Sequence, residues 1–152
     1  MSLAQYKQKR NLKKSGEPKT KTKNSINNKL IFVVHSHFAK QHHYDLRLQI
    51  NNVLKSWAVP KSPPLDKNTK RLAIQVEDHP LSYANFQGII PEGNYGAGKV
   101  KIWDKGTYEA EKFSDKEIIF NLHGKKLKGK YVLIKTNFGK NKKSWLWFKG
   151  KN

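Results

Sequence analysis

The residues best suited to chemistry lie in the segment from His43 to Arg47. Apolar and polar side chains alternate here, and this period of two predicts a β-strand with His43, Asp45 and Arg47 on one face. A His and a carboxylate could hold a divalent metal ion, and an Arg beside them could bind phosphate oxygens. His37 lies six residues before His43, close enough for a turn to return it to that face. The sequence thus favours a catalytic metal site, although the spacing fits a solvated strand face equally well.

Two further histidines, His35 and His42, alternate away from this set, and we expect them to be surface or core residues. His79 precedes Pro80, which restricts it to an extended conformation at a strand end. With Tyr83 nearby, this imidazole could act as a general acid or stabilise a developing charge. An Asp-His-Pro segment is, however, more often a hydrogen-bonded turn.

Three other side chains could contact phosphate, namely Ser56, Lys61 and Arg71, and each could equally be an ordinary surface residue. The glycine-rich segment 91–98 is similar to a nucleotide-cradling loop. No helical pattern follows it, so the Rossmann and P-loop interpretations fail. We expect a tight connection between strands that needs positive φ angles.

The charge of the chain is strongly basic. Lys and Arg number 31 against 11 acidic residues, which gives a net charge of +20. This imbalance predicts a nucleic-acid partner, because Lys and Arg side chains that neutralise backbone phosphates release the counterions condensed there, and this release favours binding. Residues 1–29 carry nine Lys or Arg and one acid, and ten Lys but no acid follow Glu117. We expect a basic N-terminal arm over residues 1–29 and one domain over residues 30–152.

The chain has no cysteine, so a metal must be held by His, Asp, Glu or backbone oxygen. No apolar run is long enough for a membrane span, and the first thirty residues lack the apolar stretch of a signal peptide. We therefore expect a cytoplasmic protein without a membrane partner.

Short alternating or β-branched segments recur through the chain, and helical periodicity is almost absent. This pattern predicts a mainly β fold, as a small antiparallel barrel or sandwich. Asn51-Asn52 is a good two-residue turn, Leu72, Ile74 and Val76 are expected to be buried, and a hairpin is expected to turn near Asp104–Lys105. The predicted strands are residues 30–34, 43–50, 53–59, 71–77, 99–103, 106–111, 117–122, 129–136 and 144–149, with loops and a short helical turn near residues 83–86 between them.

Five motifs stand in order along the chain. They are His37-x5-His43-Tyr44-Asp45-Leu46-Arg47-Leu48, Ser56-Trp57-Ala58-Val59-Pro60-Lys61, Arg71-Leu72-Ala73, Glu77-Asp78-His79-Pro80-x2-Tyr83 and Gly93-x-Tyr95-Gly96-x-Gly98-x-Val100-x2-Trp103-Asp104-x-Gly106. Together they resemble the 3′-phosphoesterase domain of bacterial DNA ligase D and its stand-alone archaeal and bacterial versions. The resemblance covers roughly residues 6–110 and continues loosely to the end of the chain.

The resemblance implies a compact antiparallel β-barrel with short helical turns and a manganese-dependent hydrolase. Such an enzyme removes a 3′-terminal ribonucleoside and then the 3′-phosphate, which leaves a 3′-hydroxyl during DNA repair by non-homologous end joining. Its partners would be the 3′ ends of DNA or of RNA-tipped primer-templates, and a separate ligase or polymerase could complete the repair.

The resemblance also assigns roles to individual residues. It implies metal ligation by His37, His43 and Asp45. Catalytic roles fall on Arg47, Arg71, His79 and Tyr83, and supporting phosphate or substrate contacts fall on Ser56, Lys61, Arg10, Asn11 and Glu17. The family has Asp where this chain has Asn11, in a segment that matters there chiefly for ribonucleoside removal.

Two alternatives stay open. One is an enzyme that acts only as a 3′-phosphomonoesterase. The other is a non-catalytic basic β-barrel that binds nucleic-acid ends and needs no metal, with tryptophans as stacking platforms. The candidate platforms are Trp57, Trp103, Trp145 and Trp147, although core and hairpin packing is the stronger interpretation for them.

Overall fold

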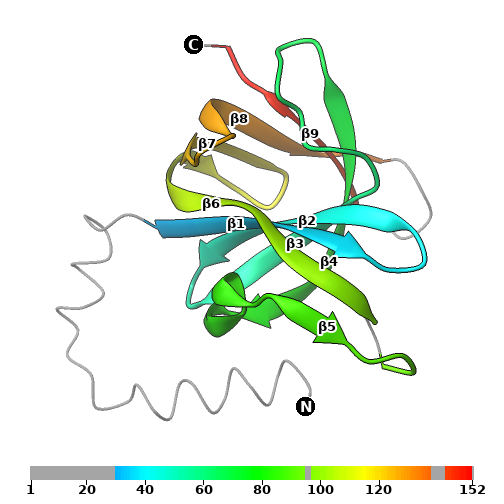
Figure 1. Cartoon of the computed structure of the whole chain (residues 1–152). Coiled ribbons are helices and arrows are strands. Elements are labelled where there is room, and N and C mark those ends of the chain that lie inside the picture. The colour runs from blue at the N-terminus through cyan, green and yellow to red at the C-terminus, as the bar shows by residue number, and fades with distance from the viewer. Residues whose placement is uncertain (1–29, 95–96, 138–142, 152) are drawn as a thin grey trace, which may run out of the picture.

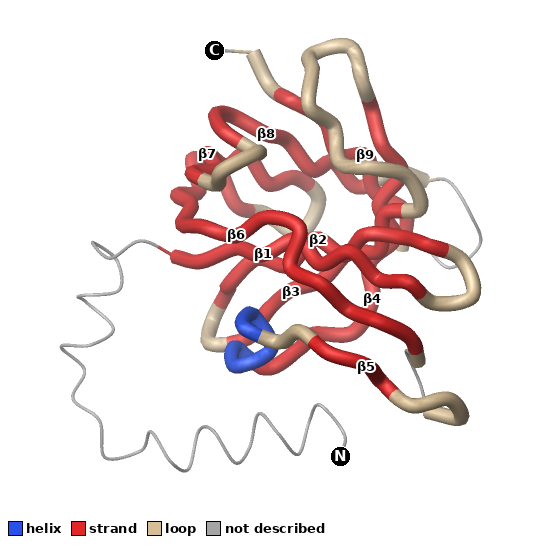
Figure 2. Tube along the Cα trace, viewed as in Figure 1, coloured by secondary structure: helices blue, strands red, loops and turns tan. Residues whose placement is uncertain are grey.

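The computed structural model describes residues 30–94, 97–137 and 143–151. The predicted arm, with Arg10, Asn11 and Glu17, lies outside these residues. The described chain is mostly strand (Figure 2), with one short 3-10 helix. The elements are β1 (Leu30–Phe38), β2 (His42–Ile50), β3 (Val53–Val59), β4 (Lys70–Pro80), η1 (Leu81–Asn85), β5 (Gly88–Ile90), β6 (Gly98–Phe113), β7 (Glu117–His123), β8 (Lys128–Lys135) and β9 (Ser144–Lys149). Among the described residues, no helix is long and apolar enough to cross a membrane.

Eight of the strands close into an antiparallel barrel (Figure 1), which confirms the expected mainly β fold. The order is β1-β2-β3-β4-β9-β8-β7-β6, and β6 pairs back onto β1. The long β6 makes this closure, because its first part pairs with β1 and its last part with β7. The short β5 adds to β6 outside the barrel.

The predicted hairpin at Asp104–Lys105 is wrong, since β6 runs through both residues without a turn. The carboxylate of Asp104 accepts hydrogen bonds from three consecutive backbone N–H groups, at residues 125–127 of the β7–β8 connection. Its side chain therefore binds a distant loop rather than a local turn.

In contrast, Asn51 and Asn52 do form the turn between β2 and β3, both with positive φ. Positive φ is also found at Gly93 and Gly98, as expected for the glycine-rich connection.

The barrel interior holds the main hydrophobic core. Even-numbered residues of β1 and β2, such as Phe32 and Leu46, point into it together with Trp57, Trp145 and Trp147. These three tryptophans are almost fully buried, so the core interpretation holds for them and they offer no platform for stacking. A second small cluster of Val33, Leu54 and Ala84 lies on the other face of the strands. There η1 packs against the outside of the barrel.

Strand β4 carries a β-bulge that decides which of its side chains face outward. Leu54 of β3 pairs with His79, whereas Ser56 pairs with Val76, so β4 has one residue more than β3 in this interval. Such an insertion changes the face on which later side chains lie. The predicted burial of Leu72, Ile74 and Val76 is wrong: Ala73 is fully buried, whereas Leu72 is 40% exposed and Ile74 and Val76 are half-buried.

Candidate active site

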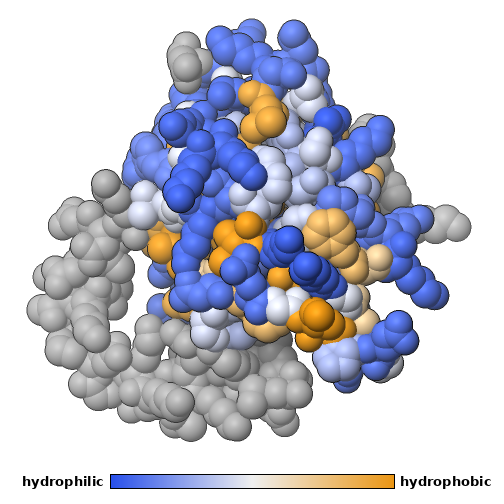
Figure 3. All heavy atoms as spheres, in the orientation of Figure 1, coloured by the Kyte–Doolittle hydropathy of each residue, from blue (hydrophilic) through white to orange (hydrophobic). Residues whose placement is uncertain are grey.

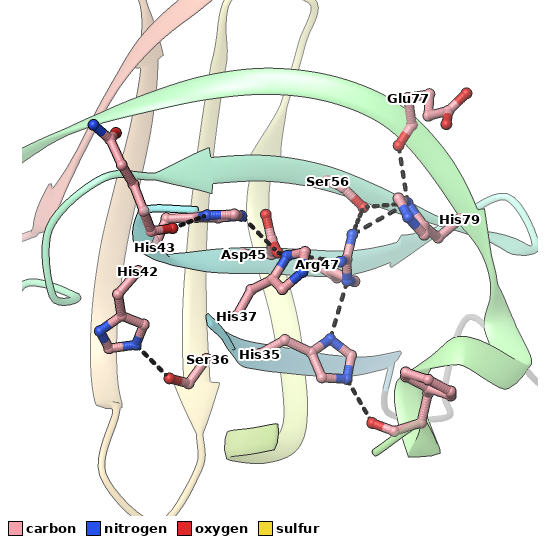
Figure 4. A network of polar contacts seen from close by, with 12 residues as sticks. His35, Ser36, His37, His42, His43, Asp45, Arg47, Ser56, Glu77 and His79 are labelled. Carbon is pink, nitrogen blue, oxygen red and sulfur yellow. Dashed lines mark hydrogen bonds and ion pairs between the residues drawn. The ribbon is translucent and has the colours of Figure 1, made fainter. Parts of the chain in front are cut away.

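The outer face of the β1–β2 hairpin gathers the predicted metal ligands. His37 pairs directly with His43, and His35 pairs with Asp45. Directly opposed residues of an antiparallel pair point to the same face. Figure 4 shows the imidazoles of His37 and His43 beside the carboxylate of Asp45. The potential ligand atoms of these three residues all lie within 4.8 Å of one another.

Asp45 lies at the centre of this cluster. Its Oδ2 is 3.8 Å from Nδ1 of His37 and 3.5 Å from Nε2 of His43. The same oxygen is 3.4 Å from Nη2 of Arg47. Burial alone would raise the pKa of Asp45, but hydrogen bonding to both imidazoles and the charge of Arg47 together bring that pKa well below its ordinary value. The carboxylate is therefore ionised at neutral pH.

This donor set fits a catalytic divalent metal ion. Two imidazole nitrogens and one carboxylate oxygen are ligands for a first-row transition metal, and three protein ligands leave coordination positions for substrate or water. His37 and Asp45 are buried, whereas His43 is half-exposed. The cluster is thus anchored on one side and open to solvent on the other, as a substrate-binding metal site requires.

Arg47 connects the metal cluster to the remaining site residues. Its Nη1 donates to Oγ of Ser56 at 2.8 Å, and its Nε donates to Nδ1 of His35 at 3.1 Å. Nη1 also lies 3.1 Å from Nδ1 of His79, and the guanidinium carbon is 4.9 Å from the centre of the Tyr83 ring. A buried guanidinium held by this many partners has a fixed orientation, which suits it to bind a phosphate group.

His35 belongs to the site, and the expectation that it lies away from the ligand set is wrong. Its Nε2 donates to the backbone oxygen of Phe86 at 3.0 Å, so Nδ1 is free to accept from Arg47. Burial, reinforced by the charge of Arg47, lowers the pKa of His35 to about 4 and keeps it neutral. The signal was present in the sequence: His35 and His37 are two residues apart, and β1 continues through both.

His79 reaches the same face from β4. Its Nδ1 lies 3.1 Å from both Nη1 of Arg47 and the backbone oxygen of Glu77, so the tautomer decides which of them it pairs with. Burial, followed by the charge of Arg47, lowers the pKa of His79 to about 4. The imidazole is thus neutral at physiological pH and has one proton to donate.

Tyr83, on η1, closes the site above Arg47. Its ring is 4.9 Å from that of His79 and 5.3 Å from that of His35, and it stacks on Phe86. Burial raises the pKa of the phenol, so the hydroxyl keeps its proton and remains a hydrogen-bond donor.

Among the described residues, no hydrogen bond or ion pair joins Lys61 or Arg71 to the residues gathered around Arg47. Lys61 is exposed in the loop after β3. Arg71 is half-buried and pairs with Trp147 of β9, and its Nε donates to the backbone oxygen of Ser62 at 2.6 Å. The bulge in β4 separates its face from that of His79. The structure thus brings together His37, His43, Asp45, Arg47, Ser56, His79 and Tyr83, and it places Arg71 with the 61–69 loop.

Comparison with known proteins shows the family to which the chain is similar. The family model of the DNA Ligase D 3'-phosphoesterase domain matches residues 35–135. The chain is 49% identical over 139 residues to the multifunctional non-homologous end joining DNA repair protein LigD of Mycobacterium tuberculosis, covering 89% of this chain and 18% of that protein. It is 44% identical over 156 residues to LigD of Pseudomonas aeruginosa, covering 99% and 19%.

The match covers all the residues gathered at the site, from His35 to Tyr83. The chain belongs to the DNA ligase D 3′-phosphoesterase domain family. It spans about a fifth of the length of the curated relatives it matches. Membership in this 3′-phosphoesterase family supports a hydrolase activity.

Proposed function

We propose that this protein is a manganese-dependent phosphoesterase that heals the 3′ ends of DNA. It removes a 3′-terminal ribonucleoside and then hydrolyses the remaining 3′-phosphate to a 3′-hydroxyl. The observation that carries the proposal is the convergence of His37, His43 and Asp45 beside the buried guanidinium of Arg47. A site for a divalent cation next to a fixed phosphate-binding group is what phosphoester hydrolysis requires.

The metal is proposed to be held by His37, His43 and Asp45. When bound, it would supply Lewis-acid polarisation of a nonbridging phosphate oxygen. The nitrogen-rich ligand set favours manganese or a neighbouring metal over magnesium, which prefers oxygen ligands.

Arg47 binds the other phosphate oxygens and offsets charge in the transition state. Ser56 and His35 hold the guanidinium in place, so little reorganisation is needed when substrate arrives. When Nδ1 of His79 accepts from Arg47, the proton of the neutral imidazole is on Nε2. That proton can stabilise the phosphate or pass to the leaving oxygen. Tyr83 packs against the His79 ring, and its protonated hydroxyl would donate a supporting hydrogen bond to the phosphate.

We propose that Arg71 joins Arg47 in holding the oxygens of the reacting phosphate and that Lys61 supports substrate binding. The proposed substrates are 3′ ends of DNA, including primer-templates tipped with RNA. A relative named for non-homologous end joining supports DNA ends as the substrate. We propose that a separate ligase or polymerase then uses the 3′-hydroxyl.

The direct test is an end-trimming assay with two substrates, a DNA primer ending in one ribonucleotide and a primer ending in a 3′-phosphate. The protein is incubated with each, with manganese or with a chelator. We expect shortening of the first and phosphate release from the second, in both cases only with manganese. Release of phosphate without shortening of the ribonucleotide primer would restrict the function to a 3′-phosphomonoesterase.

A variant pair controls the assay. His43→Ala removes one proposed ligand and should abolish both reactions, whereas His123→Ala removes an exposed histidine on β7 and should preserve them. Full activity of His43→Ala would eliminate the proposed metal site. DNA binding without any turnover by the unmodified protein would instead support the non-catalytic binder.

A further inference from the structure

An exposed row of side chains crosses four strands next to the metal cluster. Phe38 of β1 pairs with His42 of β2 on one side and with Lys99 of β6 on the other. Lys99 in turn pairs with Ile89 of β5. Directly opposed residues point to the same side of a sheet. These four residues therefore form one continuous surface, here called the four-strand row.

The four-strand row combines flat aromatic groups with positive charge. The rings of Phe38 and His42 stack at 4.3 Å with an interplanar angle of 5°. Phe38 is 44% exposed and Ile89 74% exposed. Lys101 is also exposed and points to the same side, because it pairs with Ser36. In Figure 3, orange atoms lie beside blue ones over β5 and the adjoining part of β6.

The aromatic pair is held rigidly. Nε2 of His42 lies 2.7 Å from Oγ of the buried Ser36. The His42 ring also contacts the Tyr44 ring at 4.9 Å, and Tyr44 in turn contacts Trp103, which packs against the barrel core. A surface ring backed by this ladder loses little side-chain entropy when a ligand stacks on it.

The four-strand row is adjacent to the proposed chemistry but faces the other way. The next residue pair along the same two strands is His37 with His43. Figure 4 shows His42 and Ser36 on one side of the hairpin and His43 and Asp45 on the other. The two residue pairs are neighbours along the strands, so a nucleic-acid strand that runs from the metal cluster around the tip of this hairpin can reach the four-strand row.

We propose that Phe38, backed by His42, is a stacking platform for a nucleobase of the substrate strand near its reacting 3′ end. Lys99 and Lys101 would bind the neighbouring phosphates, since aromatic groups interleaved with cations are the chemistry that holds single-stranded nucleic acid. A ring stacks on any base, so the platform adds affinity without reading sequence. This inference rests on the proposed function and names the contact that positions its substrate.

The test measures phosphate release from a single DNA strand with a 3′-phosphate. Base–aromatic stacking predicts that Phe38→Ala raises KM about tenfold with little change in kcat. Phe38→Trp should retain the wild-type KM, whereas Phe38→Leu should not, because it keeps apolar bulk but lacks a flat ring. The matched control is Phe113→Ala, which removes a phenylalanine of similar exposure (49%) at the other end of β6.

Abasic substrates make the test specific for a base. One base at a time is removed near the 3′ end of the strand. At one position the wild-type KM should rise to that of Phe38→Ala, and the variant should be insensitive to the same change. An unchanged KM for Phe38→Ala, an equal loss on every abasic strand, or a change in oligomeric state instead of KM would overturn the platform.

Failure of the proposed function gives a different result. In that case the wild type releases no phosphate from any strand. Binding of the same strand, followed by fluorescence anisotropy in metal-free buffer, still shows whether Phe38→Ala weakens affinity relative to Phe113→Ala. Equal affinities of the two variants would overturn the platform independently of catalysis.

Discussion

Two buried aspartates lie in the same sheet and have opposite surroundings. Asp45 and Asp104 are 5% and 4% exposed. The carboxylate of Asp45 faces side chains, namely two imidazoles and a guanidinium. That of Asp104 accepts from four backbone N–H groups, at residues 105 and 125–127. Side chains can rearrange around a ligand, whereas backbone amides fix a loop.

This difference in contacts suits Asp45 to a catalytic site and Asp104 to holding a loop in place. Oδ2 of Asp45 is within 4 Å of three potentially cationic groups, the kind of position that a metal ion can share. Asp104 joins β6 to the β7–β8 connection, far along the chain. Both residues are buried aspartates, so the groups that contact each carboxylate determine its role.

Replacing the first aspartate should have the largest effect. Asp45→Asn removes the charged ligand and should lower the rate of 3′-phosphate release about a thousandfold, from the loss of several kcal/mol of metal-dependent transition-state stabilisation. Circular dichroism should show an intact β fold. Manganese affinity, measured by calorimetry, should fall in parallel. Retention of both activity and metal affinity would contradict the assignment of Asp45 as a ligand.

Replacing the second aspartate should reverse this pattern. Asp104→Asn puts an amide donor against backbone donors, and buried N–H groups lose their acceptor. We expect a loss of about 3 kcal/mol in the free energy of unfolding, measured with urea. The rate per folded molecule should stay close to that of the wild type. Asp115→Asn, at an exposed position before β7, is the control and should change neither quantity.

The pH dependence of stability should reveal the buried histidines around Arg47. Burial and the charge of Arg47 lower the pKa of both His35 and His79 to about 4, against about 6.5 in an unfolded chain. Unfolding therefore takes up protons between these pH values. Their stabilisation is fully present above pH 6.5 and is lost as the pH falls toward about 4.

Allowing for the partial exposure of His79, we expect the free energy of unfolding of the metal-free protein to fall by about 2 kcal/mol from pH 7 to pH 5. His43, whose pKa is raised by its hydrogen bond to Asp45, opposes part of this trend. His35→Gln should reduce the slope, whereas His123→Gln, at an exposed position, should leave it unchanged. Equal slopes for the wild type and His35→Gln would show that His35 titrates normally.

Local pattern predicted the centre of the site well. Alternation placed His43, Asp45 and Arg47 on one face, and the structure brings them together with His37. The Asn51-Asn52 turn also followed from local chemistry. His35 was misplaced because the predicted strand ended at Val34, so the period of two was not continued to His35 and His37.

Other features depend on partners far along the chain. Asp104–Lys105 has the composition of a turn, but closure of the barrel keeps β6 extended through it. The face of β4 depends on its register with β3, and residue types within β4 do not encode that register. The family resemblance supplied His79 and Tyr83, and the structure brings both to Arg47. The roles of Lys61 and Arg71 stay predictions.

Because of the bulge in β4, the number of residues between Val76 and His79 determines whether His79 faces the site. Between the Ser56–Val76 pair and the Leu54–His79 pair, β4 contains one residue more than β3. Removing that residue would act on the strand as a frameshift acts on a reading frame, turning every later side chain over. His79 would then face the barrel interior, although its own identity and neighbours in sequence were untouched. The length of this interval is therefore as much a part of the active site as the imidazole it delivers.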